Sequence, residues 1–226
     1  MKVPFYISNV FAESAWGGNP LAIVPLLDGD IQLDTQTMQR IARQFNLSET
    51  VFITPPRESG QIAHLRIFTA ENEMPFAGHP TIGAAQWLHQ QFNLSDSFTL
   101  STEAKIVQIQ NDAGIYRFTL SGYESAACGF SNEHLTQALG LRLGDVDEGA
   151  RWMNAGTWQL IIRVNSREAV FNAQPDIKQL SDPDFPAVHA NTYIWHEIDG
   201  QVTSRYFFSN FGCLDEDPGT GSACAN

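Results

Sequence analysis

The chain has 226 residues, of which 43% are hydrophobic and only 17% are charged, enough apolar material for one large or two small packed cores. Thirteen Lys and Arg stand against 25 Asp and Glu, so the formal net charge is -12, and no basic run interrupts the chain. Nucleic acid and anionic membranes both need clustered positive charge, so we exclude both as partners.

The N-terminus, MKVPFYISNVFAE, lacks the long apolar stretch of a signal peptide, and no apolar run reaches the roughly 18 residues of a membrane span. We therefore expect a cytoplasmic protein. Three cysteines, Cys128, Cys213 and Cys224, are odd in number and lack metal-type CxxC spacing, which favours packed, reduced thiols over a disulfide framework.

In the first third of the chain the pattern predicts strand, loop, strand, helix and strand. Residues 2–11 and 21–26 have the composition of strands and flank the turn-rich loop AESAWGGNP. Residues 34–46 carry apolar side chains at helical spacing, and Asp34 is the expected N-cap. ETVFIT, residues 49–54, is the next predicted strand.

A second helix and more strands follow. AHLRIFTA, residues 63–70, is predicted as a strand, and the polar loop ENEMPFAGHP leads into a helix over residues 81–92. Residues 98–110 and 115–123 are predicted as two long strands, and the sequence NDAG between them is typical of a hairpin turn.

The second half repeats the plan of the first. LRIFTAENEMPFAGHPTIGAA and TSRYFFSNFGCLDEDPGTGSACAN each contain Arg and Phe in a strand, an acidic loop, and then the pattern P-x-x-G-[HS]. Upstream, GGNPLAIV corresponds to AGTWQLIIRV, with Pro20 55 residues before Pro75 and Trp158 60 residues before Pro218. The agreement predicts a duplicated structural unit, with lobes at residues 1–122 and 123–226.

The repeat also predicts that the second lobe is C-terminally incomplete. After Gly78 the first unit continues for some 44 residues to Gly122, whereas only five residues follow Gly221. A helix and about two strands would be missing. The second sheet would then expose an edge and an apolar face, which a partner copy or a swapped segment could cover.

Glu49 is the first candidate for chemistry. It stands in NLSETVF beside Ser48, where a strand begins. A Glu at such a place is usually solvated, but the following TVFIT is unusually apolar. Desolvation there would raise the carboxyl pKa above its ordinary value of about 4.3, as a general acid/base near neutrality requires.

His79 is the second candidate, because it follows Gly78 and precedes Pro80 at a helix start. It could simply cap the helix, or the exposed N–H groups could hold a carboxylate with help from the imidazole. Ser222 is its counterpart in the repeat and would cap a second helix. Asp217, just before Pro218, is by itself ordinary turn chemistry.

A duplicated plan would bring both helix N-termini to one pseudo-twofold junction. Two positive helix ends facing one cavity would suit an anionic small molecule, such as a carboxylic acid or an amino acid.

The segments GNPLAIV, NLSETVF, FTAENEMPFAGHPTIGAA and DEDPGTGSA resemble the signature segments of the phenazine-biosynthesis isomerase family (PhzF-like proteins), within the diaminopimelate-epimerase fold superfamily. The resemblance spans the chain. It implies an α+β fold of two similar lobes, each a curved mixed sheet around a central helix, with the active site between them.

The resemblance also implies roles for individual residues. Glu49 matches the general acid/base that moves a proton between carbons of a cyclic diene acid, and His79 and Asp217 match residues that orient the substrate and assist proton transfer. The matching substrate-binding positions are Ser48, Gly78, Gly221 and Ser222. No cofactor or metal is implied, the substrate is a small carboxylate, and a homodimer is expected.

Two alternatives stay open. One is a catalytically silent homologue that binds small molecules or other proteins, since the second lobe is expected to be incomplete. The other is an amino-acid epimerase or racemase, which in this superfamily uses paired cysteines at the two helix starts. PFAGHP and DPGTGS contain no Cys, so two-base racemisation is disfavoured.

Overall fold

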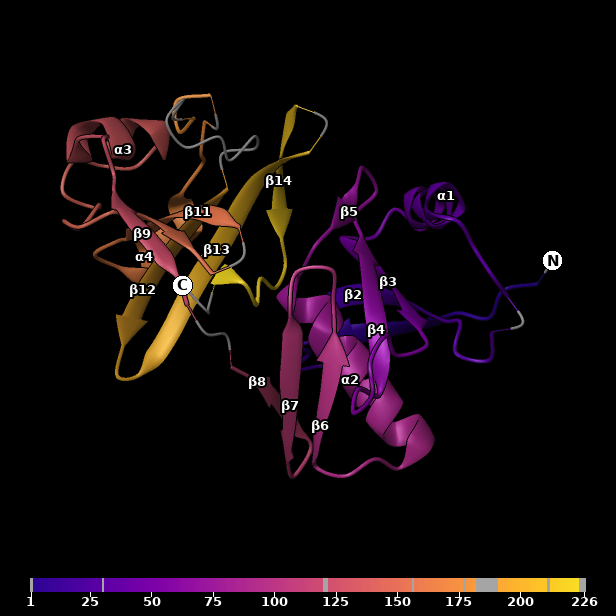
Figure 1. Ribbon diagram of the computed structural model, residues 1–226. Coiled ribbons are helices and arrows are strands. Elements are labelled where there is room, and N and C mark those ends of the chain that lie inside the picture. Colours follow the sequence, from indigo (N-terminus) through magenta and orange to yellow (C-terminus); the bar gives the residue numbers. More distant parts are fainter. Residues whose placement is uncertain are drawn as a thin grey trace. The chain divides into compact units, whose positions relative to one another are not determined.

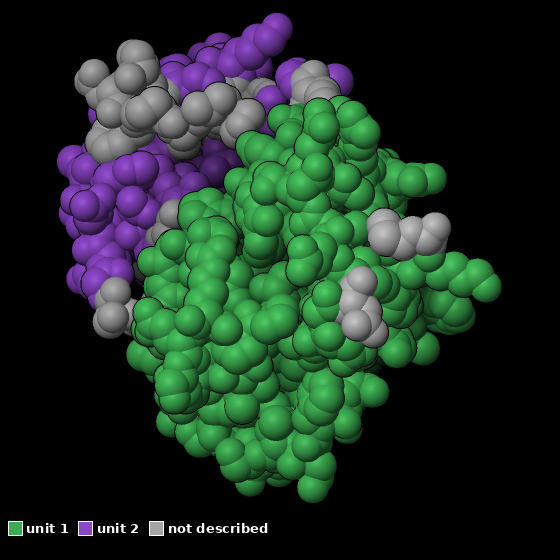
Figure 2. All heavy atoms as spheres, turned by 45° about the vertical axis from the view of Figure 1, so that its right-hand side comes forward, with its two compact units in different colours: residues 1–120 green, residues 121–226 purple. Residues whose placement is uncertain are grey.

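The computed structural model describes residues 2–29, 31–119, 122–155, 157–176, 178–181, 191–210 and 212–223. The chain divides into two compact units, unit 1 (residues 1–120) and unit 2 (residues 121–226), coloured green and purple in Figure 2. Each unit combines one curled mixed sheet with helices, so the expected α+β class is confirmed (Figure 1). In the part of the chain that is described, none of the helices has the length and apolar character to cross a membrane.

Unit 1 is built on an eight-stranded sheet in the order β1-β2-β3-β4-β6-β7-β8, with β5 paired to β4. The parallel pairs are β2 with β3 and β4 with β6, and the other neighbours are antiparallel. The strands are β1 (Tyr6–Val10), β2 (Asn19–Pro25), β3 (Glu49–Thr54), β4 (Ala63–Phe68), β5 (Glu73–Met74), β6 (Ser97–Ser101), β7 (Ile106–Asp112) and β8 (Ile115–Phe118).

Two helices cover opposite faces of this sheet. Helix α1 (Thr35–Phe45) packs on β3 and β4 through Met38 and Ala42, and it is capped by Asp34, whose carboxylate accepts from the Thr37 amide at 2.7 Å. The predicted N-cap is therefore confirmed. Helix α2 (Gly78–Phe92) packs on the other face, where its small residues allow a close approach.

Gly83 of α2 shows how close this approach is. A Cβ atom there would stand 2.4 Å from Cδ2 of Leu21 and 2.8 Å from Cγ2 of Val10. Only a hydrogen fits between this turn of the helix and the two strands below it.

Two predicted boundaries in unit 1 are wrong. Helix α2 begins at Gly78 rather than at residue 81, because Pro80 fits the first helical turn, where its missing N–H is no loss. The strand predicted over residues 98–110 is two strands, since a turn at Thr102–Lys105 separates β6 from β7. The predicted NDAG hairpin between β7 and β8 is confirmed, with positive φ angles at Ala113 and Gly114.

Unit 2 has a six-stranded sheet in the order β14-β13-β12-β11-β10-β9 among its described residues. Helices α3 and α4 contribute Leu135 and Val170 to the core on one face, together with Trp152 and Phe207 of the sheet. The elements are β9 (Glu124–Ala127), α3 (Asn132–Ala138), β10 (Arg151–Asn154), β11 (Trp158–Arg163), α4 (Arg167–Asn172), β12 (Thr192–Ile198), β13 (Gln201–Asn210) and β14 (Cys213–Asp217).

The two sheets repeat one order of pairing. The run β1 to β5 pairs antiparallel, parallel, antiparallel and antiparallel, with α1 in the parallel connection. The run β10 to β14 pairs in the same order, with α4 in the parallel connection. The repeat that the sequence predicts is thus also present in the order of strand pairing.

An arginine and a glutamate mark the same place in both units. Arg66 on β4 donates through Nε and Nη2 to the two oxygens of Glu73, both at 2.7 Å. Arg205 on β13 donates in the same way to Glu216, at 2.8 and 2.7 Å. We call these two contacts the paired Arg–Glu bridges. They align Glu73 with Glu216, so the following P-x-x-G segments also correspond.

Candidate active site

Glu49 and Ser48 lie where α1 has ended and β3 begins. Asn46 ends α1 in the left-handed conformation, with φ 51°, and its N–H bonds to the carbonyl of Ala42. The chain then turns into β3, whose first residue, Glu49, pairs with Leu21 of the parallel strand β2. The turn leaves the Glu49 carboxylate at the edge where both parallel strands start.

His79 on the first turn of α2 meets this carboxylate. Its Nδ1 lies 2.8 Å from Oε2 of Glu49, and the two side chains are only 3% and 16% exposed. The contact is close but not aligned as a hydrogen bond. Oε2 of Glu49 and Nε2 of His79 are both buried without a hydrogen-bond partner among the described residues. Buried polar atoms of this kind are uncommon and call for a partner such as a ligand or water.

The N-terminus of α2 is also open. Its N-cap is Ala77, which provides no side-chain hydrogen bond, and the first turn holds no acidic residue. The hydroxyl of Thr81 donates to the carbonyl oxygen of Ala77 at 2.7 Å and does not cap an amide of the first turn. The N–H groups of Gly78 and His79 therefore point out of the helix beside the Glu49–His79 pair, at its positive end.

In unit 2, Asp217 ends β14, and the hydroxyl of Thr220 donates to its carboxylate. Ser222 follows Gly221 and accepts a hydrogen bond of 2.9 Å from Nε2 of Gln159 on β11. Gln159 is fully buried, although the strand around it is apolar. A helix capped by Ser222 would lie in residues that the structure does not describe.

Register identifies a residue that sequence reasoning missed. Arg66 pairs with Phe52, and its counterpart Arg205 pairs with Ile194. Phe52 therefore corresponds to Ile194, and counting back three residues brings Glu49 to Asn191, just before β12. Asn191 donates through its amide to the carbonyl of Trp158 at 3.5 Å. Its only sequence signal is its place before a buried strand.

Unit 1 thus brings together Ser48, Glu49, Gly78 and His79, through strand β3 and the start of α2. Unit 2 brings together Asp217, Gly221 and Ser222 in one loop after β14. The predicted union of these two groups in one cavity stays a prediction.

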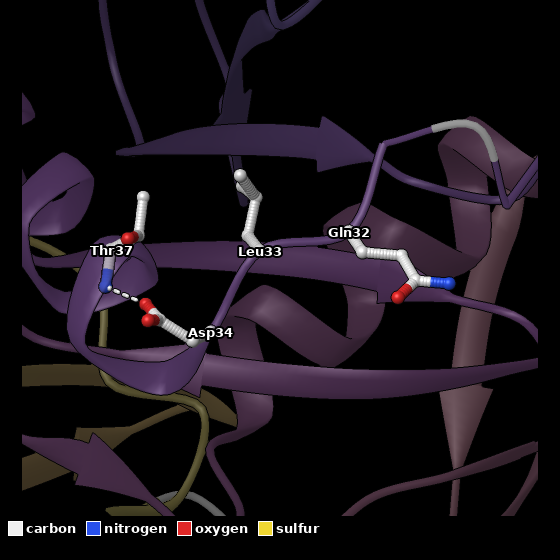
Figure 3. Close-up of a pocket in the computed structure, with 4 residues that line it drawn as sticks. All are labelled: Gln32, Leu33, Asp34 and Thr37. Atoms are coloured by element: carbon white, nitrogen blue, oxygen red, sulfur yellow. Dashed lines mark hydrogen bonds between the residues drawn. The ribbon is translucent and has the colours of Figure 1, made fainter.

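A hollow elsewhere in unit 1 is lined by Gln32, Leu33, Asp34 and Thr37 (Figure 3). The pKa of Asp34 is lowered by hydrogen bonds from the side chain and backbone of Thr37, which is what an N-cap carboxylate experiences. This hollow lies at the start of α1, about 16 Å along the helix from its other end near Ser48. The hollow surrounds the N-cap of α1 and is not part of the candidate site.

Neither described cysteine occupies a helix start. Cys213 is exposed in β14 and Cys128 is half-buried after β9, while Cys224 lies outside the described residues. The first turn of α2 carries His79, and the loop after β14 carries Ser222. Among the residues that are described, His, Cys, Asp and Glu side chains form no group of three that could hold a metal ion.

Comparison with known proteins gives a consistent result. The family described as phenazine biosynthesis-like protein matches residues 8–226. An uncharacterised isomerase of Pasteurella multocida is 44% identical over 225 residues, which cover 98% of this chain and 75% of that relative. The trans-2,3-dihydro-3-hydroxyanthranilate isomerase of Pseudomonas chlororaphis is 32% identical over 240 residues, covering 97% of this chain and 76% of that relative.

Solved structures confirm the expected fold. A PhzF-family phenazine biosynthesis protein of Bacillus anthracis has a TM-score of 0.81 at 26% identity, covering 99% of this chain and 78% of that one. A probable proline racemase of Agrobacterium radiobacter has a TM-score of 0.61 at 11% identity, covering 96% of this chain and 73% of that one. The second likeness concerns the fold alone.

Proposed function

Because the chain belongs to the phenazine biosynthesis-like (PhzF) family and is an isomerase of that family, we propose that it moves a proton between carbons of a small cyclic or amino-acid-like carboxylate. The reaction needs no cofactor. The observation that carries the proposal is the buried pair of Glu49 and His79 at the uncapped start of α2.

In the proposed mechanism the substrate carboxylate binds at the N–H groups of Gly78 and His79. An allylic C–H bond is a weak acid, so its proton leaves only if the developing negative charge spreads into a conjugated carboxylate that is already stabilised. The positive helix end supplies that stabilisation without reorganisation. This gives the open N-terminus of α2 a catalytic purpose.

Glu49 is the proposed general base, and then the general acid, of the transfer. Its carboxylate takes the proton from one carbon and returns it to another carbon of the same substrate, so no net proton is consumed. His79 orients the carboxylate through the 2.8 Å contact of Nδ1 with Oε2. Acid/base assistance of this kind contributes roughly 10²–10⁴-fold to a rate.

Asp217, Gly221 and Ser222 are proposed to complete the pocket, with Ser48 at its unit 1 side. The hydrogen bond from Gln159 orients the Ser222 hydroxyl, whose proton is then available to a ligand oxygen. On this view units 1 and 2 are the two lobes expected at residues 1–122 and 123–226.

The test uses trans-2,3-dihydro-3-hydroxyanthranilate, the compound named for the Pseudomonas relatives, together with other small cyclic carboxylates. Proton exchange is followed by NMR in deuterated water, and binding by calorimetry. Glu49→Gln should abolish exchange and leave binding within a few-fold, while the exposed control Glu58→Gln should change neither. A Glu49→Gln variant with near-full activity would remove Glu49 from the mechanism.

The same experiment separates the alternatives. Binding without exchange in the unaltered chain would favour a silent binding homologue over an enzyme. Loss of exchange after thiol alkylation would favour the cysteine-based epimerase. The homodimer and the cytoplasmic location also remain proposals, and light scattering of the purified chain decides the first.

A further inference from the structure

A turn outside the proposed catalytic pair contacts the segment that leads into it. The turn Thr102–Lys105, which we call the bracing turn, is closed by the amide of Thr102 on the Lys105 carbonyl at 2.8 Å. The amide of Lys105 in turn donates to Oγ1 of Thr102 at 3.2 Å. Two bonds across four residues make this a defined turn between β6 and β7.

The bracing turn contacts the segment Pro75–Ala77 directly. The amide of Ala104 donates to the carbonyl of Pro75 at 3.0 Å, and Nζ of Lys105 lies 4.7 Å from the centre of the Phe76 ring. Phe76 and Ala77 are buried, and Phe76 also packs edge-on against Phe118. Since α2 begins at Gly78, these contacts hold the residues directly before its first turn.

Glu103 fastens the bracing turn to the sheet. Both of its carboxylate oxygens accept from Arg57, one of them at 3.0 Å, and Oε1 lies 3.3 Å from Nε2 of His64 on β4. Oε1 is also 3.9 Å from Nε of Arg66. The hydrogen bonds from Arg57 lower the pKa of Glu103 to about 2, so the carboxylate is ionised at neutral pH.

The histidine that Glu103 contacts is buried. His64 is only 1% exposed, and its Nδ1 lies 3.0 Å from Oγ of Ser101, which donates to Oε1 of Gln61 at 2.8 Å. The contacts run from this network through Glu103, Ala104 and Pro75 to the start of α2. The proposed catalytic mechanism uses none of them.

We propose that Glu103 is a positioning residue for the isomerase. It holds the bracing turn against Pro75–Ala77 and thereby sets the distance of His79 from Glu49 and the direction of the α2 amides. The inference rests on the proposed function, because it assigns Glu103 an effect on that site. Misplacing a reacting group by about 1 Å can cost on the order of 10²-fold in rate.

The test compares Glu103→Ala with Asp112→Ala, a control on β7 that removes an exposed carboxylate paired to one arginine, Arg117, at 3.1 Å. Glu103→Ala should lower kcat at least about tenfold with KM within about twofold, and Glu103→Gln should recover part of the loss. Asp112→Ala should leave both constants unchanged.

A second measurement does not depend on turnover. NMR of the His79 imidazole in the full chain should show changed chemical shifts in Glu103→Ala, but not in Asp112→Ala. If Glu103→Ala fails to fold, Lys105→Met takes its place, since it removes the ammonium group 4.7 Å from the centre of the Phe76 ring and should shift the same signal.

The two proposals fail in different ways. If Glu49→Gln retains activity, the proposed function falls, while the His79 spectrum still shows whether Glu103 positions that residue. An unchanged His79 spectrum in a folded Glu103→Ala variant overturns the positioning role, and so does a kcat equal to that of Asp112→Ala.

Discussion

Unit 1 and unit 2 share an order of strand pairing and the paired Arg–Glu bridges, but they differ in the residues at two corresponding places. Where unit 1 has Glu49, unit 2 has Asn191, and where unit 1 has His79, unit 2 has Ser222. Both replacements are neutral groups that can donate and accept hydrogen bonds but do not titrate near neutral pH.

The difference teaches that the framework and the chemistry of the repeat are separable. The bridges of Arg66 with Glu73 and Arg205 with Glu216 have nearly the same geometry, so they serve the sheet that both units need. At these two corresponding positions unit 1 has a titratable pair, and unit 2 has Asn191 and Ser222. We therefore expect unit 1 to transfer the proton and unit 2 to contribute neutral contacts to the ligand.

The largest expected effect comes from making unit 1 resemble unit 2. Glu49→Asn should lower kcat/KM by roughly 10²–10⁴-fold, because an amide cannot accept the proton. The matched change Asn191→Ala should cost less than about tenfold, as expected for one hydrogen bond. Steady-state kinetics on both variants checks the asymmetry, and equal losses would contradict it.

The paired Arg–Glu bridges should matter to stability in both units. Arg66→Met removes a half-buried ion pair and Arg205→Met a more exposed one, and each should lower the free energy of unfolding by about 1–3 kcal/mol. The decrease in unfolding free energy should be larger for Arg205→Met, because Arg205 also donates to three carbonyls at the end of α4, those of Val170, Phe171 and Ala173. Urea denaturation measures both.

The control for that prediction is Arg117→Met, which breaks an exposed pair with Asp112. It should change the unfolding free energy by less than about 1 kcal/mol. A bridge variant no less stable than this control would show that its bridge is not a structural support.

Ser222→Ala tests whether unit 2 contributes to substrate binding and not to proton transfer. It leaves Nε2 of Gln159 without its 2.9 Å acceptor and removes the hydroxyl that is proposed to contact the substrate. A lost hydrogen bond of this kind costs about 1 kcal/mol, so KM should rise about fivefold with little change in kcat. A fall in kcat as large as that of Glu49→Asn would place Ser222 in the proton transfer itself.

Among the described residues, the loss of stability in acid should be larger in unit 1 than in unit 2. The pKa of Glu103 is about 2 in the folded chain, against an ordinary value of 4.5, chiefly because Arg57 donates to it. The unfolded chain binds more protons between these values, so the stabilisation is complete above about pH 4.5 and is lost as the pH falls toward 2. Burial lowers the pKa of His64, which adds a loss of the same sign below its ordinary value of 6.5.

Glu103→Gln should therefore flatten the fall of Tm with acid. Because the carboxylate is partly solvated, the effect corresponds to about 1–2 kcal/mol after screening is discounted. Asp176→Asn is the matched change in unit 2, where hydrogen bonds from Gln179 and Lys178 also lower the carboxyl pKa. Asp176 is fully exposed, so its variant should alter the profile less, and the reverse order would contradict the prediction.

Local signals predicted much of unit 1. Asp34 was identifiable as a cap from its place before a periodic helix, and the apolar run after Glu49 marked β3 with its observed bounds. The positions of Glu49 and His79 were also readable, because each stands at the start of an element. Their 2.8 Å contact was not, since it depends on how α2 lies over β3.

Other features could be identified only from the hydrogen bonding and strand pairing in the structure. Thr102–Lys105 lies within polar and apolar alternation that favours one continuous strand, yet hydrogen bonds across the turn and to Pro75 break the strand there. Asn191 could be matched to Glu49 only through the pairing of Arg66 and Arg205 with their neighbours. Sequence spacing alone does not define such a match, because the loop between β3 and β4 and the loop between β12 and β13 differ in length.

The close approach at Gly83 carries an evolutionary consequence. Since a methyl group there would collide with Leu21 and Val10, these three positions share one small volume directly beneath the helix that carries His79. Lineages that acquire alanine at position 83 should show a smaller side chain at position 21 or 10, so the three positions should covary among descendants of this chain.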